Sequence, residues 1–158
     1  MKLSSLSWIK VITDEDCNKW AYTRQRLKEL DNCIDANEFT IFPLGFKDET
    51  ACKPERENLI ALIQKGKLTH IVEVLDEDPY TTTDWFFRFV RVWWWKPTLE
   101  WEYLPSQSDL LGFDPGIRDG KPHLIVNLNR YRERWENDGK FEGFKQYLTK
   151  NLSQFSRS

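Results

Sequence analysis

The chain has 158 residues, 40% of them hydrophobic and 30% charged, which is typical of one globular domain with a buried core. Its formal net charge of −2 at pH 7 provides no general electrostatic attraction to nucleic acid or to a membrane surface. We therefore expect a single domain over residues 1–158. Any affinity for a polyanion must come from a local basic groove.

Cysteine and histidine usage restricts the compartment and the cofactors. The three cysteines, Cys17, Cys33 and Cys52, lack CxxC spacing, which favours free thiols in a reducing compartment. With only two histidines beside them, no metal-ligand spacing emerges, so we expect no metal and no cofactor. No signal peptide and no apolar run of membrane-spanning length is visible. The expected location is the cytoplasm, without membrane contact.

The first 57 residues predict two strands around one helix. The pattern LSWIKVIT over residues 6–13 predicts a short strand. Thr13 and the acidic residues after it resemble a capping box, and apolar residues then recur at nearly helical spacing. A second strand is expected over residues 38–44, ended by Pro43, with a polar loop over residues 45–57. The stripe of the predicted helix consists of Cys17, Trp20, Leu27, Leu30 and Ile34.

Residues 58–97 carry the clearest pattern. Three segments rich in β-branched, aliphatic and aromatic residues are separated by Lys65-Gly66-Lys67 and by the polar connection 76–84. This predicts antiparallel strands joined by one tight and one longer turn. Alternation divides the third strand into two faces, both apolar, so we expect it to be covered on both sides. One face carries Phe86, Arg88, Val90, Val92 and Trp94, and the other Trp85, Phe87, Phe89, Arg91, Trp93 and Trp95.

The last third predicts short elements separated by turns. The turn signals Asp114-Pro115-Gly116 and Asp119-Gly120 divide it in two. The expected elements are an extended piece over residues 99–103, a single turn from Ser106 to Gly112, a strand over 123–128, a helix over 130–137 capped by Asn129, and a helix over 140–152. Together these elements predict an α+β fold, with a bent, mostly antiparallel sheet or small β-barrel and flanking helices.

The carboxylates after the second central strand provide the only candidate for metal-dependent hydrolysis. A nuclease of the PD-(D/E)xK kind requires a strand-borne acidic pair with a nearby lysine. Val74-Leu75 follow Glu73, and no lysine occupies the required position. There is also no GxSxG elbow and no phosphate-binding glycine loop. We therefore expect a protein that is not an enzyme, with a nuclease as a distant alternative.

Aromatic residues interleaved with cations are the best candidate for a binding site. Aromatic faces stack on bases, and arginine pairs with phosphate or a base edge. The alternative interpretation is a core strand whose arginines form structural ion pairs with Glu73 or Asp76. The predicted ligand-binding residues are Trp8, Lys10, Trp20, His70, Trp85, Arg88, Arg91, Trp93 and Trp95.

The order of these segments resembles the small β-barrels of the PUA-like superfamily, and most closely the EVE, YTH and ASCH branches. The resemblance rests on residues 59–75, with THIVEV as the second strand, on residues 87–95 and on Trp8-Ile9-Lys10-Val11. It covers about half of the chain through soft patterns, and Thr69-His70 stand where many relatives carry glycine. The resemblance implies a barrel whose pocket, in the EVE and YTH branches, accepts a modified base in an aromatic cage.

Two classes of function follow. The first is a non-enzymatic module that binds a nucleotide or a modified base, with RNA or DNA as the partner. The second is a protein-interaction or regulatory domain whose exposed tryptophan and arginine side chains contact a partner protein. A pocket that holds aromatic rings and a cation favours the first class, and a flat apolar patch favours the second.

Overall fold

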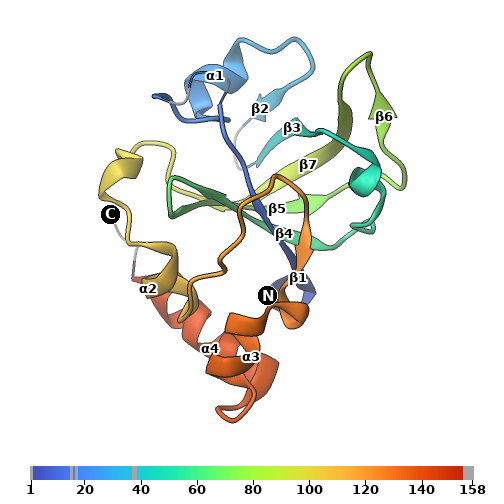
Figure 1. Ribbon diagram of the computed structural model, residues 1–158. Helices are drawn as coiled ribbons and strands as arrows, with labels where there is room; N and C mark the ends of the chain where they lie inside the picture. The colour runs from blue at the N-terminus through green and yellow to red at the C-terminus, as the bar shows by residue number, and fades with distance from the viewer. Residues whose placement is uncertain (1, 15, 17, 37–38, 155–158) are drawn as a thin grey trace.

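A computed structural model describes residues 2–14, 16, 18–36 and 39–154 and shows one mostly antiparallel sheet with short helices against it (Figure 1). The α+β prediction is confirmed. The strands are β1 (Leu6–Val11), β2 (Ile34–Ala36), β3 (Phe39–Phe46), β4 (Leu59–Gln64), β5 (Lys67–Val74), β6 (Tyr80–Thr81), β7 (Phe86–Trp95) and β8 (His123–Leu124). The α-helices are α1 (Arg24–Lys28), α2 (Gln107–Leu111), α3 (Asn129–Trp135) and α4 (Lys140–Ser153).

The sheet has the strand order β2-β3-β7-β5-β4-β1-β8, with β6 paired to β7. Only β1 and β4 run parallel among the described strand pairs. Within the described residues, β2 and β8 are the two ends of this order, so the sheet does not close into the barrel that the sequence offered as an alternative. No helix in the described part of the chain has the length and apolar character needed to cross a membrane.

The central strands β4 and β5 separate two hydrophobic clusters. Every residue of β4 is buried, which fits a strand with cover on both faces. Figure 1 shows α2, α3 and α4 together on one side of the sheet, with α1 and β2 on the opposite side. The helix-side cluster includes Ile9, Ala61, Ile71, Leu111, Trp135 and Phe144. We call the cluster on the opposite face, toward α1 and β2, the concave-side cluster. It includes Trp8, Leu27, Phe42, Ile60, Leu62, Val72, Val90 and Val92.

Two β-bulges reset the alternation along the central strands. Leu62 pairs with His70 but Ile63 pairs with Leu68, which leaves Thr69 as an extra residue in β5. In the same way, the pairing of β5 with β7 leaves Trp93 as an extra residue. An extra residue reverses the side on which later residues point. The face prediction for β7 is therefore wrong beyond this point: Trp94 packs with the helix-side cluster and Trp95 with the concave-side cluster.

The N-terminal helix prediction is largely wrong. Only α1 is helical, and its N-cap is Thr23, whose side chain accepts a hydrogen bond from the Arg26 amide. Ile34 belongs to β2 instead of the helical stripe. Ala21 and Leu27 of this segment are buried, whereas Leu30 and Ile34 are exposed. Glu15 and Cys17, like Glu38 in the predicted strand, lie outside the described residues.

The other predicted boundaries are confirmed in part. Pro43 does not end its strand, because it lies within β3 opposite Phe89. Ser106 caps α2, which ends at the left-handed Gly112, as predicted. The helix over 140–152 is confirmed as α4. The strand predicted over 123–128 ends after Leu124 and continues as a 3-10 turn, and a similar turn replaces the extended piece before residue 104.

The core prediction is confirmed: Ile60, Leu62, Ile71 and Val90 have no exposed surface, and Val92 is 9% exposed. We expect Ile71→Ala to lower the free energy of unfolding by about 2–4 kcal/mol, because it leaves a cavity between strands covered on both faces. Ile34→Ala is the matched control, since Ile34 is 51% exposed on the edge strand β2 and should cost less than about 0.5 kcal/mol. Urea denaturation of both variants measures the difference, and equal losses would contradict the prediction.

Candidate ligand-binding pocket

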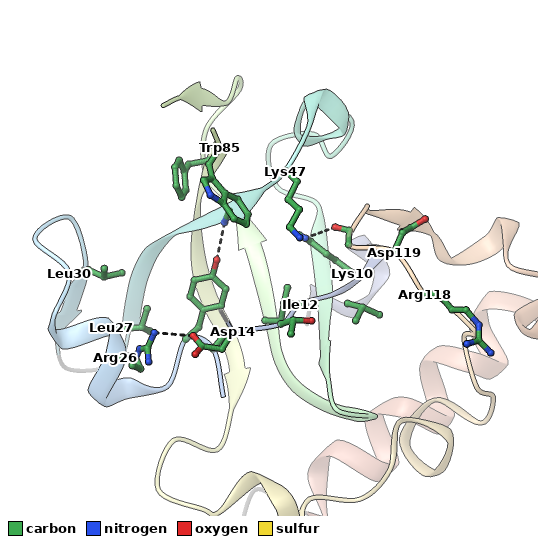
Figure 2. A pocket seen from close by; sticks show the side chains of 17 residues that line it. Lys10, Ile12, Asp14, Arg26, Leu27, Leu30, Lys47, Trp85, Arg118 and Asp119 are labelled. Carbon is green, nitrogen blue, oxygen red and sulfur yellow. Dashed lines mark hydrogen bonds and ion pairs between the residues drawn. The ribbon is translucent and has the colours of Figure 1, made fainter. Parts of the chain in front are cut away.

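A pocket of about 620 Å³ opens on the concave side of the sheet, within the usual size range for small-molecule sites. Segments distant in sequence form it: the end of β1, the segment through α1, the end of β3, the start of β7 and the loop 118–120 (Figure 2). Its lining includes Lys10, Ile12, Asp14, Tyr22, Arg26, Leu27, Gly45, Lys47, Trp85, Phe87 and Asp119.

Strand alternation in β1 directs Lys10 into this pocket, on the same side as Trp8 and Ile12 of the concave-side cluster. Lys10 is only 4% exposed. Its Nζ donates to the carbonyl oxygen of Gly120 at 2.5 Å and lies 4.9 Å from the centre of the Phe46 ring. Burial lowers the pKa of Lys10 to about 8; the positive charge of Lys47 acts in the same direction, while Asp48 and Asp119 oppose it.

Tyr22 also lines the pocket. Its backbone is left-handed at φ 58°, a conformation that non-glycine residues seldom adopt. The hydroxyl accepts a hydrogen bond from the Gly45 amide at 3.0 Å, and the ring packs on Phe42 at a centroid distance of 4.6 Å. Burial raises the pKa of Tyr22, so the hydroxyl is neutral at physiological pH.

A buried polar cluster holds the backbone of Ala21 and Tyr22 against the sheet. The side-chain amide of Gln64 bonds both backbone groups of Ala21, at 2.7 Å and 3.0 Å, much as a neighbouring strand would. His70 Nε2 lies 3.0 Å from the carbonyl oxygen of Tyr22, which only accepts, so Nε2 carries the proton. His70 Nδ1 then accepts from the Thr69 hydroxyl at 2.8 Å, and Thr69 accepts from Gln64 at 3.0 Å.

Gly45 provides the space in which the aromatic side chains meet. A Cβ atom at this position would lie 3.3 Å from the Trp85 ring and 3.4 Å from both the Phe87 ring and the Tyr22 hydroxyl. The 3.3 Å contact with Trp85 is tighter than most Cβ contacts, so the absent side chain permits the rings to approach β3. Trp85 is half-buried and lies over the cavity, with Lys47 Nζ 6.0 Å from its ring centre.

Charged groups of both signs surround the aromatic wall. Arg26 pairs with Asp14 at 2.9 Å on one side, and Lys10 and Lys47 lie on the other (Figure 2). Asp119 belongs to the same rim, where its carboxylate bonds His123 at 2.7 Å. That contact is the largest cause of the lowered pKa of Asp119.

Two of the nine predicted binding residues, Lys10 and Trp85, line the pocket. Three others have contacts elsewhere on the concave side. Trp8 is buried and donates from Nε1 to Asn58 at 3.0 Å. Trp95 stacks on His70 at a centroid distance of 5.5 Å, behind the wall that Tyr22 presents.

Arg88 and Arg91 form the structural ion pairs that the sequence left as an alternative. Arg88 is completely buried and bonds Asp76 at 2.6 Å as well as the carbonyl oxygens of Ala51 and Pro54. Arg91 bonds the buried Glu73 at 2.8 Å. Arginine side chains thus engage Asp76 and Glu73, whereas a metal-dependent nuclease would need such carboxylates as metal ligands. No group of three or more metal-ligating side chains occurs among the described residues.

The remaining predicted residues, Trp20 and Trp93, lie away from the pocket lining. Trp20 meets Trp101 edge-to-face, with Lys65 Nζ 4.5 Å from its ring centre. Trp93 packs against the helix-side cluster at the β7 bulge. All eight tryptophans are buried or half-buried, so the structure offers no fully exposed tryptophan surface for a protein partner.

Several pocket residues were missed by the sequence analysis. Asp14 and Arg26 were assigned to a regular helix. No sequence pattern around Tyr22 indicates its left-handed backbone. Phe87 had a usable signal, since it alternates with Trp85 on one face of β7. Lys47 and Gly45 came from a stretch interpreted only as a polar loop.

Comparisons of the chain with protein-family models, curated proteins and solved structures found no match. The resemblance to PUA-like domains therefore stays a prediction.

The ion pair of Arg88 generates a stability prediction. We expect Asp76→Ala to lower the free energy of unfolding by about 3–5 kcal/mol, because it leaves a buried guanidinium without its counter-charge. Asp78→Ala, at an exposed position two residues further on, should change it by less than about 0.5 kcal/mol. Denaturant unfolding of the two variants provides the test. A loss at Asp76 no larger than that at Asp78 would show that the pair contributes little.

The buried His70 generates a pH prediction. Burial lowers the pKa of His70 to about 4, from about 6.5 in the unfolded chain, although its bond to the Tyr22 carbonyl opposes the shift. Between these values the unfolded chain binds more protons, so stability is complete above pH 6.5 and falls as the pH drops toward 4. We expect His70 to contribute about 3 kcal/mol to that fall.

The measurement is the free energy of unfolding of the wild type and of His70→Gln at intervals from pH 7.5 to 4. The variant should be less stable at neutral pH and show a shallower decline in acid. His123→Gln replaces the half-exposed histidine and, because His70 is intact, should keep a steeper decline in acid than His70→Gln. Parallel curves for the wild type and His70→Gln would contradict the assignment.

Proposed function

We propose that this protein is a non-enzymatic binding module that takes a nucleobase-like ring into the pocket beside Trp85. The observation that carries the proposal is the combination of a half-buried indole over the cavity with a buried Lys10 donor. An indole face suits stacking on a planar ring, and a desolvated N–H donor suits a carbonyl or other acceptor on the same ligand.

The proposed ligand includes a nucleotide or a modified base, free or within RNA or DNA. Its planar ring lies against Trp85, with Tyr22 and Phe87 completing the apolar wall. The pocket combines apolar walls with few polar groups, which is the usual composition of a site that fixes the orientation of a small ligand. The net charge of −2 supports a ligand held mainly by ring contacts and a small number of ionic contacts.

We also propose that the fold is a member of the PUA-like group, opened along one edge. The order of strand, irregular helical segment, strand, hairpin and long strand supports this proposal. A cytoplasmic location is part of the same proposal, supported by the free thiols of Cys33 and Cys52.

The test is titration with nucleosides and with short modified and unmodified oligonucleotides, measured by calorimetry and by tryptophan emission. We expect Trp85→Ala to weaken binding by about ten-fold to more than a hundred-fold, the range of one base–aromatic stack of about 1–3 kcal/mol. Trp20→Ala is the matched control, because this half-buried tryptophan is not part of the pocket lining.

Thermal melts of both variants establish that they remain folded. If Trp85→Ala and Trp20→Ala weakened binding equally, Trp85 would not be the stacking platform. An absence of binding by every ligand at high micromolar concentration would reject the proposed function.

A further inference from the structure

We propose that the ligand of this pocket is a nucleoside phosphate monoester, whose phosphate lies between Lys10 and Lys47 while its base stacks on Trp85. This inference rests on the proposed function, since it assumes that the ring occupies the pocket. It assigns a position to the anionic group of the ligand. It also distinguishes a free mononucleotide from a base within a polynucleotide.

Two lysines converge on one side of the cavity. Lys10 comes from β1, Lys47 follows β3, and Figure 2 shows both on the side opposite the Arg26–Asp14 pair. Like charges held near each other in a partly desolvated pocket repel, and an anion between them relieves that repulsion. The arrangement therefore favours a ligand with negative charge at this end.

The carboxylates nearest to Lys10 are already engaged. Asp48 accepts hydrogen bonds from Thr50 and lies 3.7 Å from Lys121, and Asp119 bonds His123. Among the described residues, the Gly120 carbonyl is the one hydrogen-bond acceptor for the Lys10 ammonium, which has three N–H donors. The remaining donors suit phosphate oxygens.

The number of cations fits a terminal phosphate better than a polynucleotide backbone. A phosphate monoester carries a charge of about −1.5 to −2 at pH 7, which two lysines balance. A strand passing through the pocket needs cations in a row along its path. Here Arg26 is paired with Asp14, and Figure 2 shows Arg118 extending away from the other labelled side chains. One localised anionic site is therefore the better description.

The experiment compares four nucleoside 5′-monophosphates with the matching nucleosides, with dinucleotides lacking a terminal phosphate, and with inorganic phosphate, all by calorimetry. We expect the best monophosphate to bind at least ten-fold more tightly than its nucleoside. Lys10→Met and Lys47→Met should each remove most of that preference. Methionine has an unbranched side chain like the lysine stem but carries no charge.

Lys65→Met is the matched control, because Lys65 also lies over a tryptophan but outside the pocket. It should leave every affinity unchanged. Since Lys47 is exposed, its variant keeps the test decisive even if Lys10→Met fails to fold. Nucleosides binding as tightly as monophosphates would overturn this inference and leave the proposed function intact. Dinucleotides that bind as tightly as monophosphates would also overturn it, and failure of all ligands would reject both proposals.

A pH series adds a second readout. In the free protein the pKa of Lys10 is about 8, set by burial and by the facing groups Lys47, Asp48 and Asp119. Monophosphate affinity should therefore fall as the pH rises from 7.5 to 9, because the ammonium is lost. It should also fall below about pH 6, where the monoester loses its second charge. The Lys10→Met variant should lose the fall in monophosphate affinity above pH 7.5 and keep the fall below pH 6. If its affinity still fell above pH 7.5 as in the wild type, the role of Lys10 would be contradicted.

Discussion

Burial of β4 and β5 on both faces is the constraint from which the rest of the structure follows. Both strands carry apolar side chains on both faces of the sheet. A layer packed on one face alone would therefore leave the apolar side chains of the other face in water. The C-terminal helices cover one face through Leu111, Trp135 and Phe144. No helix of similar size covers the other face in the described structure. The sheet bends over it through β3 and β7, and the segment that contains α1 completes the cover.

The concave cover depends on polar contacts as well as on apolar ones. The segment before α1 is irregular, so its backbone groups need partners that a helix would supply internally. Gln64 and His70 satisfy Ala21 and Tyr22 from the sheet, and Arg88 satisfies carbonyl groups of the loop after β3. Buried networks of this kind are stable only when each member is bonded, which gives one preferred arrangement of the segment. The pocket is the space that this arrangement leaves between Tyr22 and the loop 118–120.

Sequence patterns predicted the elements whose stabilising contacts are local. The hairpin at Gly66 and helix α4 each combine periodicity with a clear turn or cap, and both are present. The segment after β1 was misassigned because its apolar spacing matched a helix, although its backbone is held by side chains from β4 and β5. The faces of Trp94 and Trp95 depend on a bulge that no local signal marks. Lys10 and Trp85 were found through residue chemistry, whereas Tyr22 and Lys47 meet them only through tertiary structure.

The two most buried cations of the concave side differ in how their donors are satisfied. Arg88 has four hydrogen bonds to Asp76, Ala51 and Pro54, so the protein itself provides its environment. Lys10 is almost as buried, yet a single carbonyl accepts from it among the described residues. Burying an ammonium costs free energy unless its donors are bonded, and an apolar side chain would cost less at this position. Arg88 therefore has a structural explanation within the described fold. The anionic ligand that we propose would supply the acceptors that Lys10 lacks among the described residues.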